Sequence, residues 1–178
     1  MKAYSTWLCS AVTLVMVVGL VTNVNAESLT TKANKAKAEF LAHDESLKAQ
    51  FDKASGYVIF PSVAKGAFGI GAAKGKGELF EKGTDKPIGE VKLSQVTIGF
   101  QAGGQAYAEL ILFEDQTALD NFKKGNFEFS AQASAVAVTA GAAANAKYEK
   151  GVMILTMAKG GLMYEASVGG QKFKYKAY

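Results

Sequence analysis

The chain has 178 residues, among them 20 Lys, no Arg and 16 acidic residues, and its formal net charge is +4. This length suits one domain, and a composition of 49% apolar and 20% charged residues argues against long disordered segments. Without Arg, the bidentate forks that read guanine or phosphate are missing, so we do not expect nucleic acid as a partner. The single Cys and single His exclude a disulfide framework and a His-rich zinc site, and we expect no metal and no cofactor.

The first 26 residues have the layout of a secretory signal peptide. Lys2 is followed by an apolar run from Trp7 to Val21 and by small or compact residues before a predicted cut after Ala26. The run has about 15 residues, whereas a membrane-spanning helix needs about 20, so an uncleaved anchor is the less favoured alternative. We therefore expect an exported protein, periplasmic or secreted and peripheral on a membrane, in which residues 27–178 form a single domain.

Residues 28–54 predict an amphipathic helix that is interrupted near His43-Asp44-Glu45. Apolar residues recur at steps of three, four and seven, at Leu29, Ala33, Ala36, Phe40, Leu47, Phe51 and Ala54. We expect this stripe to pack on the sheet of the same domain. The alternative is a helix that lies on a membrane surface, and its contacting residues would then be Leu29, Phe40, Leu47 and Phe51.

Short apolar segments separated by glycines predict strands from residue 57 onward. The expected strands are 57–60, ended by Pro61, then 78–81, 88–100, 106–114, 151–158, 162–168 and 172–175. Residues 83–87 predict a hairpin turn, and Asp115 and Gly125 predict the ends of one short helix near 115–124. The expected fold is α+β, with the N-terminal helix packed on a curved, mostly antiparallel, Gly-rich sheet that is barrel-like or sandwich-like.

The segment 131–146 carries small residues on both of its alternate faces. This pattern favours a strand that is buried on both sides. An Ala-rich helix is the competing interpretation, which Val136, Val138, Thr139 and Gly141 weaken.

The segment 69–77 is rich in glycine and resembles a phosphate-binding loop only superficially. That loop requires Gly at position 70 and Ser or Thr at position 77, where Ile70 and Gly77 stand. We therefore expect the glycines to permit strand curvature or close backbone approach. Lys65, Lys74 and Lys76 remain candidates for a basic surface that faces solvent.

Two carboxylates lie inside apolar segments, Glu109 in 107–113 and Glu165 in 162–166. Such a pair could perform general acid–base catalysis in a hydrolase. The favoured interpretation is that each carboxyl is hydrogen-bonded by neighbouring groups or faces solvent, because a buried acid without partners is costly. His43, in a charged stretch beside Asp44, is expected to be a surface residue.

Within the segment 171–178, residues 172–176 alternate strictly between basic and aromatic residues. On a strand, Lys172, Lys174 and Lys176 share one face, while Phe173 and Tyr175 share the other. One interpretation is an edge strand that lysines protect from aggregation. The other is a positive strip that attracts anionic lipid headgroups.

Four blocks of the sequence resemble the SYLF domain, a lipid-binding module of eukaryotic actin-associated and endosomal proteins and of exported bacterial proteins. The blocks occur in the family's order, from Phe60-Pro61-Ser62-Val63-Ala64-Lys65-Gly66-Ala67-Phe68-Gly69-Ile70-Gly71 through Gly99-Phe100-Gln101-Ala102-Gly103-Gly104-Gln105 and the run Glu109 to Asp115 to Ala158-Lys159-Gly160-Gly161-Leu162-Met163. The resemblance covers residues 56–175. It implies a non-enzymatic domain that binds phospholipid, without catalytic residues.

The sequence therefore predicts a non-enzymatic protein of the bacterial cell envelope whose partner is anionic phospholipid or a membrane surface. Binding would combine charge attraction through Lys65, Lys74, Lys76, Lys172, Lys174 and Lys176 with shallow apolar contact from the first helix or the Gly-rich loops. A protein-interaction or envelope-scaffold module is the alternative. A hydrolase that uses Glu109 and Glu165 is a weaker one.

Overall fold

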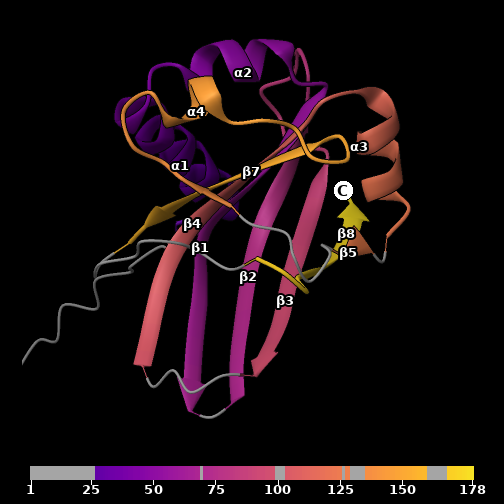
Figure 1. Cartoon of the computed structure of the whole chain (residues 1–178). Coiled ribbons are helices and arrows are strands. Elements are labelled where there is room, and N and C mark those ends of the chain that lie inside the picture. Colours follow the sequence, from indigo (N-terminus) through magenta and orange to yellow (C-terminus); the bar gives the residue numbers. More distant parts are fainter. Residues whose placement is uncertain (1–26, 69, 99–102, 126, 129–134, 160–167) are drawn as a thin grey trace, which may run out of the picture.

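The computed structural model describes residues 27–68, 70–98, 103–125, 127–128, 135–159 and 168–178. Figure 1 shows the helices α1 (Leu29–His43), α2 (Leu47–Lys53) and α4 (Ala142–Asn145) gathered at one end of a sheet whose long strands extend beyond them. The predicted leader 1–26 and most of the expected strand 162–168 lie outside the described residues. Within the described part of the chain, no helix is long and apolar enough to cross a bilayer.

The N-terminal helix is interrupted, as predicted. Helix α1 spans Leu29–His43 and α2 spans Leu47–Lys53. Ser28 caps α1, since its hydroxyl accepts a hydrogen bond from the Thr31 N–H. Asp44 separates the helices, and its Oδ1 accepts hydrogen bonds from both the N–H and the hydroxyl of Ser46.

The described strands form one open sheet, and two further helices are inserted in the chain, one after the fourth strand and one after the sixth. The strands are β1 (Gly56–Phe68), β2 (Ile70–Glu81), β3 (Gly89–Ile98), β4 (Gly103–Phe113), β5 (Phe127–Glu128), β6 (Val136–Ala137), β7 (Val152–Ala158) and β8 (Lys172–Ala177). Their order is β5-β8-β3-β2-β1-β4-β7-β6, and only β6 and β7 pair in parallel. The α+β class and the mostly antiparallel sheet are confirmed. The closed barrel is wrong, because β5 and β6 end the sheet on opposite sides.

The expectation that Pro61 ends the first strand is wrong. β1 continues to Phe68, and its pairing register shifts between Ile59 and Ser62 against β2 and between Phe60 and Val63 against β4. Pro61 therefore lies in a bulge, where its missing N–H costs no ladder hydrogen bond. Gly77 of β2 lies so close to this bulge that a Cβ would clash with the Ile59 carbonyl.

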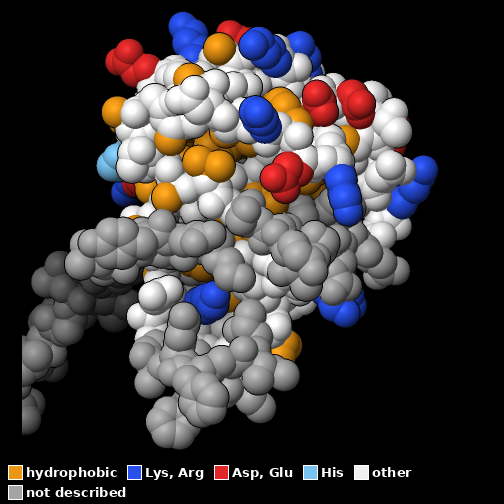
Figure 2. Space-filling model, in the orientation of Figure 1, with side chains coloured by type: hydrophobic (Ala, Val, Ile, Leu, Met, Phe, Trp, Pro, Cys, Tyr) orange, Lys and Arg blue, Asp and Glu red, His pale blue; other side chains and the backbone are white. Residues whose placement is uncertain are grey.

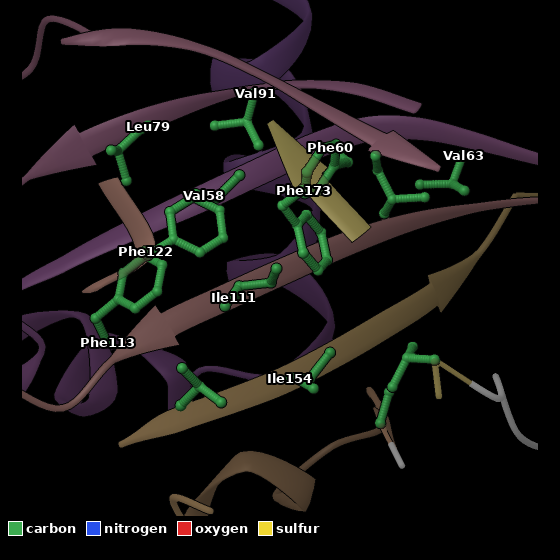
Figure 3. Packing of buried hydrophobic residues seen from close by; sticks show 14 of the residues in the cluster. Val58, Phe60, Val63, Leu79, Val91, Ile111, Phe113, Phe122, Ile154 and Phe173 are labelled. Atoms are coloured by element: carbon green, nitrogen blue, oxygen red, sulfur yellow. The ribbon is translucent and has the colours of Figure 1, made fainter. Parts of the chain in front are cut away.

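Two hydrophobic clusters cover the two faces of the sheet, because side chains alternate along each strand. The first cluster includes Leu119 and Phe122 of helix α3 (Gln116–Lys123), which Asp115 caps as predicted. Figure 3 shows side chains of β1, β4, β7 and β8 meeting in this layer. The second cluster lies under α1, α2 and the short helix α4 (Ala142–Asn145).

The expected strand 131–146 is wrong over its described C-terminal half. Residues 131–134 lie outside the described part, β6 covers only Val136–Ala137, and α4 follows. Asp44 stabilises α4 from a distance, since its Oδ2 accepts a hydrogen bond of 2.7 Å from the Ala143 N–H. The helix therefore depends on a tertiary contact that local propensity does not reveal.

Candidate functional site

Three lysines from three neighbouring strands stand directly opposite one another on one face of the sheet. Lys76 of β2 pairs with Lys92 of β3, and Lys92 pairs with Lys174 of β8. Adjacent strands lie about 4.8 Å apart, so this lysine row (Lys76, Lys92 and Lys174) places three like charges side by side. Like charges in directly opposite cross-strand positions are destabilising. The row therefore costs folding stability, which favours a role in binding an anion.

A second row of smaller and basic residues runs beside the first. Lys74 of β2 lies between Ala64 of β1 and Ser94 of β3, and Ser94 is followed by Lys172 of β8. Between these strands the sheet surface forms a pocket of about 510 Å³. Its lining consists of Ser62, Ala64, Lys74, Gly75, Lys76, Lys92, Leu93, Ser94 and Lys174, hereafter the lysine pocket.

The lysine pocket exists because small residues and uncovered strands coincide. Ser62, Ala64, Gly75 and Ser94 leave space between the long lysine side chains. Helix α1 covers the same face only farther along the strands, where the Thr30 hydroxyl donates a hydrogen bond of 2.9 Å to Glu78. The bulge at Pro61 sets the register that brings Ser62 opposite Lys76.

The positive charge of the lysine pocket is largely uncompensated. Lys92 Nζ lies 3.7 Å from Glu90 Oε1, but the Lys92 side chain is 62% exposed, so this ion pair is weak. Among the described residues, no carboxylate lies within 4.0 Å of the ammonium groups of Lys74, Lys76 or Lys174. Figure 2 shows, by contrast, basic and acidic side chains interspersed over the helical end.

The structure brings together only part of the predicted basic set. Lys74, Lys76 and Lys174 line the lysine pocket, and Lys172 lies on the same face in the second row. Lys176 also lies on this face but opposite Glu90. Lys65 pairs with Ala73, a residue of the first cluster, and therefore lies on the other face.

Sequence reasoning missed Lys92 and Ser94. Both lie in the strand that was predicted over 88–100, at positions that alternate with buried Val91 and Leu93. This alternation could have placed them on the polar face. Their juxtaposition with β2 and β8 depends on strand register, which the sequence does not state.

The predicted membrane-contact residues of the first helix are mostly covered. Phe40 and Leu47 are completely buried in the second cluster, and Leu29 and Phe51 are half-buried. The Phe51 ring packs edge-on against Tyr57 with the ring centroids 4.9 Å apart. The stripe thus packs on the domain's own sheet, and contact of this helix with a membrane stays a prediction that requires it to leave the sheet.

Glu109 lies inside the first cluster and not at the lysine pocket. Its side chain is completely buried, and its Oε2 accepts a hydrogen bond of 3.0 Å from Gln171 Nε2, which also donates to the Tyr107 hydroxyl at 3.2 Å. Burial raises the pKa of the Glu109 carboxyl to about 8, against the smaller opposing effect of Gln171. Glu165 lies outside the described residues, so the weaker alternative of a catalytic carboxylate pair stays a hypothesis.

Metal binding finds no support in the described residues, which contain no cluster of three or more His, Cys, Asp or Glu side chains. His43, which ends α1, is exposed. The charged groups that line the lysine pocket are ammonium groups, so the chemistry that the pocket offers is anion binding.

Two comparisons with known proteins bear on this site. Residues 94–177 match the family model Ysc84, described as "Las17-binding protein actin regulator". The chain is also 30% identical over 146 residues to Beta cell expansion factor A of Aeromonas veronii, an alignment that covers 82% of this chain and 55% of that protein. The chain thus spans about half the length of this relative. The segment 94–177 includes Ser94 and Lys174 of the lysine pocket, while β1 and β2 precede it.

Proposed function

Because the Ysc84 model and the Aeromonas relative both represent the SYLF family, this chain belongs to that family, and we propose that it is a non-enzymatic protein that binds anionic phospholipid at the lysine pocket. The observation that carries the proposal is the row of Lys76, Lys92 and Lys174 across three adjacent strands. The leader-like residues 1–26 support a place in the cell envelope, where a membrane surface is within reach.

The size of the charge effect fits reversible attachment. A basic residue near an anionic membrane contributes about 1 kcal/mol, so the four pocket lysines together contribute about 4 kcal/mol. That free energy corresponds to a dissociation constant of about 1 mM, so charge alone holds the protein only weakly. Additional contact is needed for firm binding.

Val96 supplies a candidate for this additional contact. It is 71% exposed and stands on the face of the lysine pocket, two residues after Ser94 along β3. A Val side chain beside basic residues can enter the region between headgroups and acyl chains, while the lysines remain with the phosphates. Apolar contact at this place is shallow, because it rests on the one Val side chain of β3.

Co-sedimentation with vesicles tests the proposal. Replacing Lys76, Lys92 and Lys174 together with Glu should abolish binding to vesicles that contain phosphatidylglycerol, because attraction becomes repulsion. The wild-type protein should bind these vesicles at low salt and release them at high salt, and it should not bind vesicles of pure phosphatidylcholine. The matched control replaces the exposed Lys48, Lys53 and Lys147, which lie away from the pocket, with Glu. Equal loss in both triple variants would contradict a defined site.

A protein-docking function is the second candidate, and the description of the matching family model favours it. That description names binding of the protein Las17 and regulation of actin. In this chain, the exposed face of the sheet would then receive an acidic protein segment. Capture of a protein without lipid by the wild-type chain, abolished by the same triple substitution, would favour this candidate over lipid.

A further inference from the structure

Two carboxylates stand directly beside the lysine row. Glu78 of β2 pairs with Glu90 of β3, and each lies two residues from the lysine of its own strand, Lys76 and Lys92. Residues two apart on a strand share a face and lie about 6.8 Å apart. The face therefore carries a pair of negative charges next to a row of positive ones.

The acid pair is not satisfied by its surroundings. Glu78 is 1% exposed, and its Oε1 accepts hydrogen bonds from Thr30 and, at 2.6 Å, from the Tyr178 hydroxyl, while its buried Oε2 has no partner. Glu90 is partly exposed, lies 3.7 Å from the Lys92 ammonium and stands directly opposite Lys176 of β8. Like charges opposite each other cost stability, and a buried carboxylate oxygen without a partner adds to that cost.

We infer that the lysine pocket takes a phosphate ester that carries a primary amine, a headgroup of the ethanolamine type, with the phosphate on the lysine row and the ammonium on Glu90. This inference rests on the proposed function, because the same lysines hold the phosphate, and it extends that function from anionic headgroups to a zwitterionic one whose ammonium Glu90 receives. The ammonium stands next to Glu90 at the edge of the pocket, and the charge of Glu78 behind it adds to the attraction.

The binding step is an exchange of partners that balances every charge. In the structure Lys92 and Glu90 form a weak ion pair of 3.7 Å. When the ester enters, Lys92 turns to the phosphate and Glu90 turns to the ammonium, so both side chains keep an opposite charge. A glycerol ester of phosphate offers no cation to Glu90, whose remaining basic neighbour is then Lys176, directly opposite it on β8. The pocket therefore prefers the amine ester over a glycerol ester of the same phosphate.

The test uses soluble headgroups and amide chemical-shift titrations of the full mature chain. The probes are glycerophosphoethanolamine and glycerophosphoglycerol, and the variants are Glu90→Gln and the exposed control Glu45→Gln, which removes the same charge far from the pocket. Wild-type protein and Glu45→Gln should each bind the amine ester about threefold more tightly than the glycerol ester, because one exposed ion pair contributes about that much. Glu90→Gln should weaken binding of the amine ester, because its ammonium loses the Glu90 carboxylate. The same variant should strengthen binding of the glycerol ester, because Glu90 no longer competes with the phosphate for Lys92.

The outcomes separate this inference from the proposed function. If the wild-type protein binds both esters equally, or if Glu90→Gln changes both alike, the ethanolamine assignment is overturned while phosphate binding stands. If neither ester binds and vesicles do not bind either, the proposed function itself fails. Thermal unfolding of each variant establishes that the compared proteins are folded.

A second experiment, with vesicles, distinguishes a lipid headgroup from a free ester. Two samples of phosphatidylcholine vesicles are compared, one containing phosphatidylethanolamine and the other the same fraction of phosphatidylglycerol. Retention of the wild-type protein on ethanolamine vesicles, lost in Glu90→Gln and kept in Glu45→Gln, identifies a lipid as the source. Binding of the soluble amine ester without such retention identifies the free ester instead, which overturns the lipid form of the inference.

Discussion

At the scale of single residues, the most unusual group of the described structure is the carboxyl of Glu109. It stands opposite Thr156 of β7 inside the first cluster, and its Oε1 and the Thr156 hydroxyl are both buried without a partner. Gln171, just before β8, reaches it across a sheet in which β8 and β4 are not neighbours. The sheet must therefore curl strongly, and Glu109 links its C-terminal strand to its centre.

The raised pKa of Glu109 predicts that the protein loses stability as the pH rises. The pKa of this carboxyl is about 8 in the folded state, above the ordinary value of 4.5. The neutral form is favoured in the fold, so its contribution is complete below about pH 4.5 and falls as the pH rises toward 8. The slope between these values is about 1.4 kcal/mol per pH unit.

Urea unfolding at a series of pH values measures this effect in wild-type protein and in Glu109→Gln. The amide of Gln has the shape of the neutral carboxyl but does not ionise, so the variant should lack this part of the slope. Ionisation of other groups contributes equally to both proteins and cancels in the difference. Parallel curves for the two proteins across pH 5 to 8 would show that Glu109 is not neutral in the fold.

At the scale of elements, local patterns predicted what local chemistry decides. The apolar spacing and the interruption at Asp44 indicated α1 and α2, and Asp115 and Gly125 indicated the ends of α3. The bulge at Pro61 and helix α4 escaped prediction, because the first depends on the glycines of β2 and the second on distant Asp44. Long-range contacts, not propensity, determine these features.

The Asp44 carboxylate should be the main stabiliser of the joint between α1, α2 and α4. Burial raises the pKa of its carboxyl, but the hydrogen bonds from Ser46, Ala143 and Gly141 outweigh this, so the pKa is lowered. Asp44→Ala removes the acceptor and leaves the Ala143 N–H unpaired. We expect a loss of about 2 kcal/mol in the free energy of unfolding.

Chemical denaturation and amide hydrogen exchange check this expectation. Exchange at Ala143 should accelerate more than exchange in the centre of β4, because the Ala143 N–H loses its Asp44 acceptor while α4 keeps the hydrogen bond of 3.0 Å from Gln50 Nε2 to the Ala143 carbonyl. Asp52→Ala, an exposed change in α2, serves as the control and should leave both measurements close to wild type. A similar effect of both substitutions would show that the joint does not depend on Asp44.

At the scale of the whole molecule, the candidate site is a product of strand order. The sequence indicated basic positions one strand at a time, in the segments 65–77 and 172–176, but the lysine pocket exists because β8 pairs with β3 and β3 with β2. Lys65 shows the limit of this reasoning, since it belongs to the same basic segment as Lys74 and lies on the other face. The pairing of the strands determines the charge density of the pocket, whereas the sequence reveals only the individual lysines.

The charge density of the pocket predicts that binding and stability oppose each other. Lys76 has no carboxylate within 4.0 Å among the described residues and stands beside Lys92, so Lys76→Gln removes a repulsion without breaking an ion pair. The variant should gain about 0.5 kcal/mol of stability at low salt and bind anionic vesicles more weakly. High salt should remove the gain, because it screens the repulsion in the wild-type protein.

Thermal unfolding at low and high salt, together with vesicle sedimentation, measures both sides of this opposition. The exposed Lys48→Gln in α2 removes the same charge without a lysine directly opposite, so it should change neither stability nor binding appreciably. A wild-type protein that is as stable as Lys76→Gln at low salt would mean that the row carries no repulsion. Repulsion among its lysines would then no longer support the lysine row as an anion-binding site.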